Sequence, residues 1–99
     1  MTTPFYRRAW RLDADHPCLP GHFPGAPVVP GVLVLEWLAR ALRDSRGLRL
    51  KRISQVKYLH PWLPGRDVEL QLGEAGTGFV FELLDQGLVL ARGRAEAEP

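Results

Sequence analysis

The chain has 99 residues, of which 45% are hydrophobic, and this size and composition are typical of one domain with a single core. Lysine and arginine number 13 against 11 aspartate and glutamate, giving a net charge of +2. With no nucleic-acid motif beside it, this charge does not favour a nucleic-acid-binding protein. One cysteine, Cys18, excludes an intrachain disulfide and a multi-cysteine metal site.

The same totals lead to three further expectations. No apolar run reaches the length of about 20 residues that crosses a membrane, so no membrane span is expected. With a single cysteine and no signal-like apolar run after Met1, we expect a cytoplasmic protein. A domain this small buries only about two-thirds of the surface of its unfolded chain, so pairing with a second subunit would add stability.

The first half of the chain predicts a strand, a loop and a helix. Residues 5–12 mix aromatic and basic side chains, which we interpret as an edge strand. Residues 32–42 are apolar apart from Glu36 and Arg40, and Gly47 is expected to end this helix. Because apolar residues lie on several faces, we expect the helix to be enclosed on most sides. Its packed stripe is predicted to consist of Leu35, Leu38, Ala39 and Leu42.

After the helix the hydrophobic period changes to 2, which is typical of strands. The expected elements are a strand through Ile53 and Val56 that breaks at 61–65, a strand around 68–72, a turn at 73–78, a strand at 79–84, a turn at 85–87 and a strand at 88–94. We expect residues 1–4 and 95–99 to fray. The order predicts a single α+β domain over residues 1–99, with the helix held against one face of a curved antiparallel sheet.

A proline-rich loop is expected to place a histidine near a carboxylic acid. Residues 21–32 read G-H-F-P-G-A-P-V-V-P-G-V, so His22 lies in this loop, and the helix that follows carries Glu36. Prolines fix φ and remove backbone donors, so the segment is neither helix nor central strand and must be a stiff loop. The pattern therefore indicates an acid/base pair.

These residue types suit an elimination reaction. An imidazole can accept a proton near neutral pH, and a carboxyl group in an apolar site can donate one. Free backbone N–H groups at Gly31 and Val32 could polarise a carbonyl at the start of the helix. Two structural alternatives stay open: loop carbonyls could satisfy His22, and Glu36 could form an i, i+4 surface ion pair with Arg40.

The basic residues are concentrated between Arg40 and Lys57. Such a run forms a solvated face in many proteins, and it also favours docking of an acidic partner.

The motif G-H-F-P-x-x-P-x-x-P-G-V, followed by an acid fourteen residues after the histidine, resembles the hotdog-fold 3-hydroxyacyl-[acyl-carrier-protein] dehydratases of bacterial fatty-acid and polyene synthesis. A second landmark is similar to the same family, because a basic-aromatic strand ends in P-x-x-P-G at Lys57 to Gly65. The close resemblance covers His16 to Leu72, and the rest of the chain matches by strand pattern alone.

By this resemblance, the family's catalytic histidine falls on His22 and its catalytic acid on Glu36, and its carbonyl-polarising backbone amide falls on Gly31. The substrate-binding residues are then expected to be Gly31, Val32, Phe23 and Trp37. Trp37 would narrow the acyl tunnel in favour of short, flat or conjugated chains.

The resemblance also implies a hotdog fold and a dimer in which histidine and acid come from opposite subunits. The dimer would be a homodimer or a heterodimer with a related hotdog chain, and the partner would be an acidic acyl carrier protein. No metal and no cofactor are expected, apart from the phosphopantetheine arm that carries the substrate.

Three functions are consistent with these expectations. The first is a (3R)-hydroxyacyl-[acyl-carrier-protein] dehydratase that forms a trans-2-enoyl thioester in a specialised lipid, polyene or pigment pathway. The second is an acyl thioesterase on the same fold, in which Glu36 activates water. The third is a non-catalytic, acyl-carrier-binding subunit of a heteromeric dehydratase, which the small size of the chain and Arg40 favour.

Overall fold

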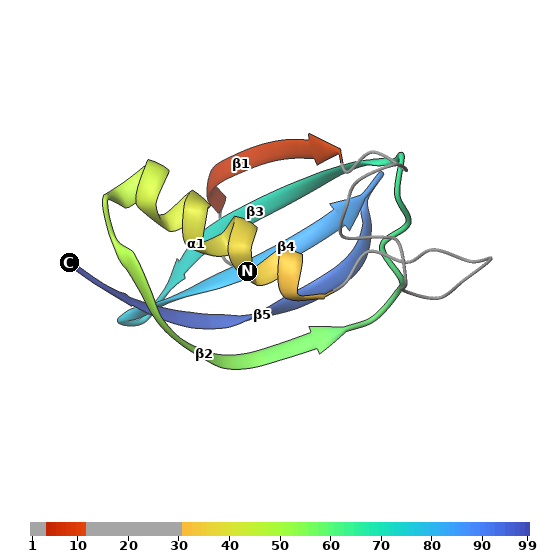
Figure 1. Cartoon of the computed structure of the whole chain (residues 1–99). Helices are drawn as coiled ribbons and strands as arrows, with labels where there is room; N and C mark the ends of the chain where they lie inside the picture. The colour runs from red at the N-terminus through yellow and green to blue at the C-terminus, as the bar shows by residue number, and fades with distance from the viewer. Residues whose placement is uncertain (1–3, 12–30) are drawn as a thin grey trace.

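The computed structural model describes residues 4–11 and 31–99 of the chain (Figure 1). In this part, five strands and one helix follow one another in the predicted order. The elements are β1 (Pro4–Arg11), α1 (Val32–Arg46), β2 (Arg49–Tyr58), β3 (Asp67–Ala75), β4 (Gly78–Asp85) and β5 (Leu88–Glu98).

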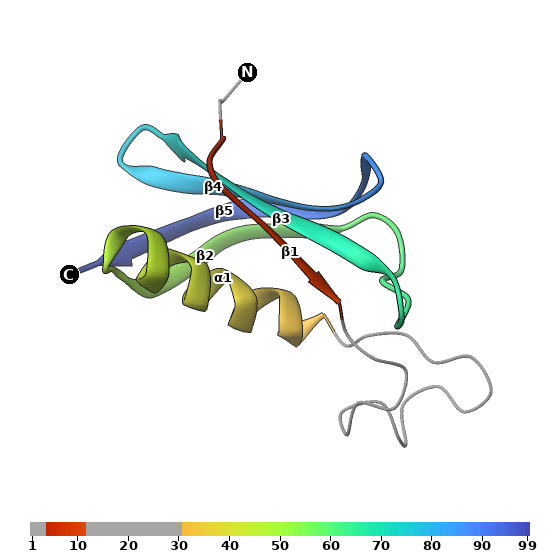
Figure 2. The same cartoon turned by 90° about the horizontal axis from the view of Figure 1, so that it is seen from above.

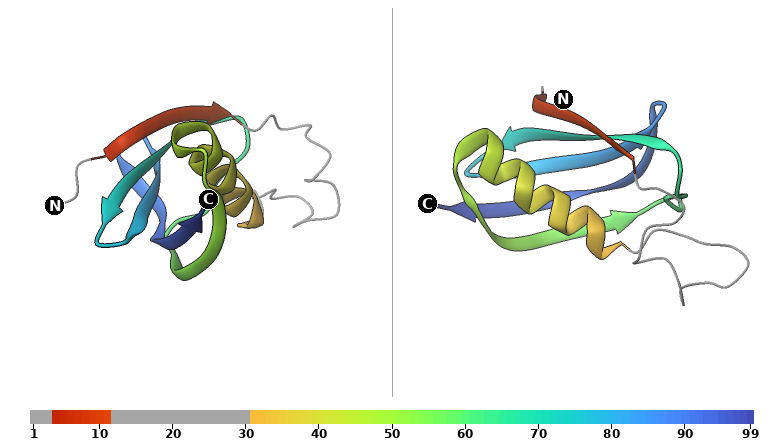
Figure 3. Two further views of the ribbon diagram at one scale, coloured as in Figure 1. Left: turned by 90° about the vertical axis from the view of Figure 1, so that its left-hand side faces the viewer. Right: turned by 45° about the horizontal axis from the view of Figure 1, so that its top comes forward.

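The strands form one antiparallel sheet in the order β1-β3-β4-β5-β2. Figure 2 shows that α1 lies along one face of this sheet, and Figure 3 shows the sheet curving around it. The helix and the strands thus form two layers, and the predicted α+β architecture and the edge position of β1 are confirmed. Strand β2 lies at the opposite edge.

The helix contacts the sheet through a stripe that differs from the predicted one. Val34, Leu38, Ala41 and Leu42 are buried, whereas Leu35 and Ala39 are only half-buried. Leu38 and Leu42 belong to both stripes, so the true stripe is rotated around the helix. The sequence does not fix this rotation, because apolar residues also lie outside the predicted stripe.

The expectation that α1 is enclosed on most sides is wrong for this chain alone. Val32, Glu36, Arg40 and Arg43 are exposed and follow one another at helical spacing on the surface. A single sheet covers only one side of a helix, so no other described element covers the remaining side.

The core lies between α1 and the inner face of the sheet. Strands β3 and β4 contribute alternate residues to this core, as the period of 2 predicts. On β2 the half-buried residues Leu50, Ile53 and Val56 lie three apart instead, because the register of β2 against β5 shifts twice. The largest fully buried side chains are Phe81, Leu38, Leu42, Leu70, Leu72, Leu83 and Val68. Gly93 makes room for this packing, because a Cβ there would overlap the Gln55 backbone carbonyl and lie 2.7 Å from Phe81 Cζ.

Two strands extend beyond their predicted ends. Strand β3 runs through the expected turn to Ala75, and the reversal occurs at Gly76, where φ is +60°. The expectation that residues 95–99 fray is wrong up to Glu98, because β5 pairs with β2 as far as Arg49 opposite Glu98. The reason is tertiary: acidic residues near the end of the chain face arginines on β2. The same expectation for residues 1–4 is wrong at Pro4, which pairs with Gly73, and residues 1–3 lie outside the described residues.

The basic segment from Arg40 to Lys57 is divided between α1 and β2, and part of it is neutralised. Arg46 forms an ion pair with Glu74 at 2.8 Å, and Arg52 with Glu96 at 2.6 Å. These carboxylates lie far from the arginines in the sequence, and the folded chain brings them within ion-pair distance. In the part of the chain that is described, no helix has the length and hydropathy required to cross a membrane.

Candidate active site

The start of α1 presents free backbone N–H groups. Gly31 is the N-cap residue, with φ −59° and ψ −24°, so its N–H group has a helical direction. Gly31 has no side chain to cap the helix, and the first turn contains no acidic residue. The partial positive charge of this helix end is therefore not neutralised by side chains of α1 itself.

Tyr58, the last residue of β2, holds Gly31 in place. Its hydroxyl donates a hydrogen bond to the Gly31 carbonyl oxygen at 3.2 Å. The same oxygen accepts a hydrogen bond from the Val34 N–H at 3.0 Å. The Tyr58 ring also lies where a side chain at position 31 would be, because a Cβ there would come within 2.8 Å of Tyr58 Cζ. These contacts require glycine at position 31 and fix the direction of its carbonyl.

Glu36 lies one helical turn after Val32, on the open side of α1. Val32 is 58% exposed, and Glu36 is also exposed. Among residues 4–11 and 31–99, Glu36 forms no ion pair with Arg40, although the two are spaced i, i+4. The surface ion pair that the sequence left open is therefore absent from this structure, and the carboxylate is free to face a ligand or a second chain.

Trp37 lies on the other side of the helix, within an aromatic cluster. Its ring centroid is 4.3 Å from that of Trp10 on β1 and 4.6 Å from that of Trp62, which follows β2. Trp62 is buried, and its indole N–H has no hydrogen-bond partner among the described residues. Trp37 thus connects the helix to β1 and to the segment between β2 and β3, and its role in shaping an acyl tunnel stays a prediction.

The structure brings together only some of the predicted site residues. Gly31, Val32 and Glu36 lie along the first two turns of α1, while His22 and Phe23 lie outside the described residues. Sequence reasoning placed Tyr58 in a family landmark but did not assign it to the site. The signal that could have found it is the aromatic side chain directly before the P-x-x-P-G segment, at the end of a strand.

A single helix packed in the curve of a five-stranded antiparallel sheet, with this strand order, defines a hotdog-fold domain. A solved structure described as the dehydratase heterocomplex ApeI:P from Xenorhabdus doucetiae superposes with a TM-score of 0.81, covering 100% of this chain and 99% of that chain, at 20% identity. The PaaI protein of the E. coli phenylacetic acid degradation operon superposes with a TM-score of 0.69, covering 100% of this chain and 79% of that chain, at 17% identity. These likenesses establish the fold.

The family follows from the sequence match. The model of the ApeI-like family, described as ApeI dehydratase, matches residues 6–94, and the chain belongs to this family. The resemblance to the hotdog dehydratases that the motifs indicated is thereby confirmed.

Named dehydratases are also similar to part of the chain. The 3-hydroxyacyl-[acyl-carrier-protein] dehydratase FabZ of Haemophilus influenzae (strain PittEE) is 38% identical over 71 residues, which is 62% of this chain and 48% of that protein. FabZ of Anaeromyxobacter sp. (strain Fw109-5) is 36% identical over 78 residues, or 65% of this chain and 49% of that protein. The chain thus spans about half the length of the curated relatives it matches.

Proposed function

We propose that this protein is a (3R)-hydroxyacyl-[acyl-carrier-protein] dehydratase. It would remove water from a 3-hydroxyacyl thioester and release the trans-2-enoyl thioester. The observation that carries the proposal is the family match over residues 6–94, which includes the glycine-capped helix start and Glu36. The FabZ relatives are named for the same reaction.

In the proposed mechanism, His22 removes a proton from C2 of the acyl chain. The backbone N–H of Gly31 donates a hydrogen bond to the thioester carbonyl oxygen and stabilises the negative charge that develops there. The electrons of the C2–H bond form the C2–C3 double bond as the C3–O bond breaks. Glu36 gives its proton to the departing hydroxyl, which leaves as water. This acid/base chemistry uses no metal and no redox cofactor.

The exposed position of Glu36 supports a site that is completed by a second subunit. A carboxylic acid donates a proton near neutral pH only if its environment raises its pKa, and burial in an apolar site does this. In the isolated chain Glu36 is exposed, beside the exposed apolar side chain of Val32. A second hotdog chain that covers this side of α1 would supply the apolar environment and bring His22 and Glu36 of opposite subunits together.

A related hotdog chain is a candidate for that second subunit. The ApeI:P structure is described as a dehydratase heterocomplex, and its matching chain has almost the same extent as this one. This observation favours a heteromeric dehydratase in which the present chain is one subunit. The substrate would be carried by the phosphopantetheine arm of an acyl carrier protein, and a pathway for specialised lipids, polyenes or pigments is consistent with the ApeI-like family.

The test is turnover of a 3-hydroxyacyl chain attached to an acyl carrier protein, followed by intact mass and by release of free thiol. We expect the mass of one water to be lost without thiol release, either with this chain alone or after a second hotdog chain is added. His22→Ala in the same assembly is the control and should remove the signal. Thiol release would instead establish a thioesterase, and no change in either assembly would contradict the proposed enzyme.

A further inference from the structure

The pairing of β2 with β5 differs in charge between its two ends. At one end, the β2 arginines Arg49 and Arg52 face the β5 carboxylates Glu98 and Glu96, and both pairs form ion pairs. At the other end, a cation on β2 lies opposite a cation on β5.

At that second end, Lys57 lies directly opposite Arg92, and Arg94 lies opposite Gln55. Like charges directly opposite on antiparallel strands destabilise the pairing. The same two strands therefore compensate their cations at one end and leave them uncompensated at the other.

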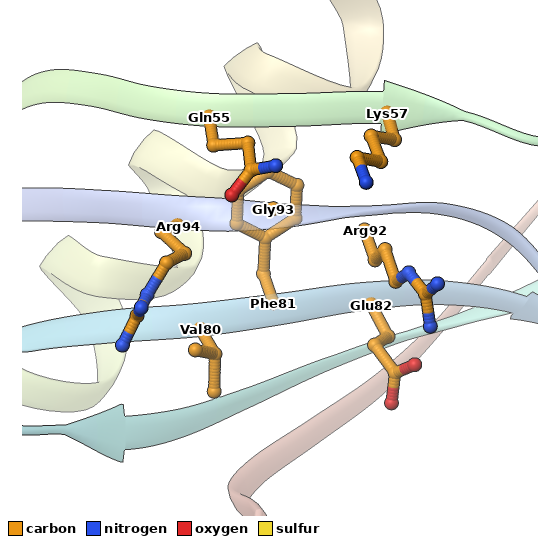
Figure 4. A pocket seen from close by; sticks show the side chains of 8 residues that line it. All are labelled: Gln55, Lys57, Val80, Phe81, Glu82, Arg92, Gly93 and Arg94. Carbon is orange, nitrogen blue, oxygen red and sulfur yellow. The ribbon is translucent and has the colours of Figure 1, made fainter.

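The cations at this second end line a groove. It lies on the face of the sheet turned away from α1 and has a volume of about 480 Å³. Figure 4 shows the side chains of Lys57, Arg92 and Arg94 on this face, with α1 behind the sheet. The described residues that line it are Gln55, Lys57, Val80, Phe81, Glu82, Arg92, Gly93 and Arg94.

The groove has an excess of positive charge. Glu82 on β4 lies directly opposite Arg92 on β5, so among the described lining residues three cations share the groove with one carboxylate. In the described part of the chain, none of the three cations forms an ion pair, and all three are exposed. An anionic ligand would relieve the repulsion between Lys57 and Arg92 and would gain the Arg94 guanidinium as a second contact.

We propose that this groove docks a carboxylate-bearing helix of the acyl carrier protein, and this inference rests on the proposed function for the identity of the partner. The Cβ atoms of residues directly opposite on neighbouring strands lie about 5 Å apart, and residues two apart on one strand lie about 7 Å apart. Carboxylates at i and i+4 on a helix have Cβ atoms about 5–6 Å apart. A helix with acidic residues at this spacing can therefore contact Arg94 and, at the same time, either Lys57 or Arg92.

The position of the groove is consistent with delivery of a substrate to the start of α1. Lys57 and Tyr58 are consecutive residues at the end of β2. Tyr58 contacts Gly31, while Lys57 lines the groove on the other face. A carrier protein docked in the groove therefore lies next to the end of β2, where Tyr58 contacts Gly31.

The first experiment compares one acyl chain on two carriers in the active assembly, as the homo-oligomer or with its second subunit. The acyl group is presented on the carrier protein and as an N-acetylcysteamine thioester. For Lys57→Glu and Arg94→Glu, KM for the carrier-bound substrate should rise about tenfold or more, with kcat unchanged, because charge reversal at a docking surface mainly weakens association. The kinetic constants for the small thioester should stay within about twofold of the wild type.

Lys51→Glu is the matched control, since Lys51 is an exposed cation on β2 outside the groove. It should leave KM for the carrier-bound substrate nearly unchanged. Equal effects of all three variants, or equal effects on both substrates, would overturn the docking proposal.

Direct binding and oligomeric state separate the remaining outcomes. Anisotropy of a labelled holo carrier protein, which needs no turnover, should show weaker binding by the groove variants and steep weakening with salt in the wild type. If wild-type and groove variants bind the carrier equally, the groove is not its docking site, whatever the enzyme activity.

A change in oligomeric state of Lys57→Glu, measured by light scattering, would assign the groove to a subunit interface and also overturn the proposal. Failure of the wild type on both substrates would contradict the proposed function, while the binding measurement would still decide the role of the groove.

Discussion

The Tyr58 hydroxyl at the end of β2 donates a hydrogen bond to the Gly31 carbonyl oxygen at the start of α1, across 3.2 Å. The two residues are 27 positions apart in the sequence, so only the folded chain brings them together. The contact joins an edge strand to the helix end at which the family's carbonyl-polarising amide falls. Tyr58 is thus suited to act as a positioning residue for Gly31.

Gly31→Ala should impair both folding and turnover. The new Cβ would lie 2.8 Å from Tyr58 Cζ, so the ring or the first turn of α1 must move. Overpacking of this kind costs about 1–3 kcal/mol, and we expect turnover to fall by at least about tenfold. Denaturant unfolding and the dehydratase assay measure the two effects.

The double variant Gly31→Ala/Tyr58→Ala tests the cause. If the ring is the obstacle, removing it should recover part of the stability lost in Gly31→Ala, so the two changes would not be additive. Additive losses would contradict a direct contact between the two residues.

Tyr58→Phe isolates the hydrogen bond from the ring. Loss of one hydrogen bond at an exposed tyrosine should lower the free energy of unfolding by about 0.5–1 kcal/mol. The bond holds the Gly31–Val32 peptide at the start of α1. If it thereby positions the adjacent Gly31 N–H, kcat should fall more than KM changes, since the interaction with the thioester oxygen strengthens in the transition state. Unchanged kcat would restrict Tyr58 to a structural role.

Glu36→Gln should remove turnover while leaving the fold intact. Glu36 is exposed and forms no ion pair within the described residues, so its replacement should change the free energy of unfolding by less than about 0.5 kcal/mol. The amide cannot donate a proton to the leaving hydroxyl, and activity should approach that of His22→Ala. Glu69→Gln, which neutralises a carboxylate on β3, is the control. A fully active Glu36→Gln variant would contradict the role of Glu36 as the general acid.

Trp37→Ala should destabilise the domain by about 3 kcal/mol, because the indole packs against both Trp10 and Trp62. Trp37→Phe keeps an aromatic ring and should fold. If Trp37 also shapes the acyl tunnel, this milder variant should shift the preferred chain length in a series of 3-hydroxyacyl substrates. An unchanged preference would leave Trp37 with a packing role alone.

Gly93→Ala should be among the most damaging small substitutions in the sheet. Its Cβ would overlap the Gln55 carbonyl and approach Phe81, which is 1% exposed and has little room to move. We expect a loss of about 2–3 kcal/mol in thermal or denaturant unfolding. Ser54→Ala, at an exposed position on β2, should be close to neutral, and equal stability of the two variants would show that β5 adjusts easily.

The order of elements could be predicted from the sequence because each element has a local cause. Apolar periodicity predicts α1, and Gly47, with φ +67°, ends it as expected. The alternation through Val68, Leu70 and Leu72 predicts β3. The spacing of His22, Gly31 and Glu36 indicates the dehydratase family without any three-dimensional contact, because the three residues lie in one short stretch of the sequence.

What the sequence by itself determined, then, is the fold class, the family and the residues of one segment that could carry the chemistry. The tertiary structure decided which face of α1 is buried, because several faces of this helix are apolar and only the curvature of the sheet selects among them. It also decided which charges are neutralised: Glu96 reaches Arg52, while Lys57 meets Arg92, and both outcomes depend on the register of β2 against β5. Register and long-range contacts arise from packing the whole chain at once, and no local pattern in the sequence specifies them.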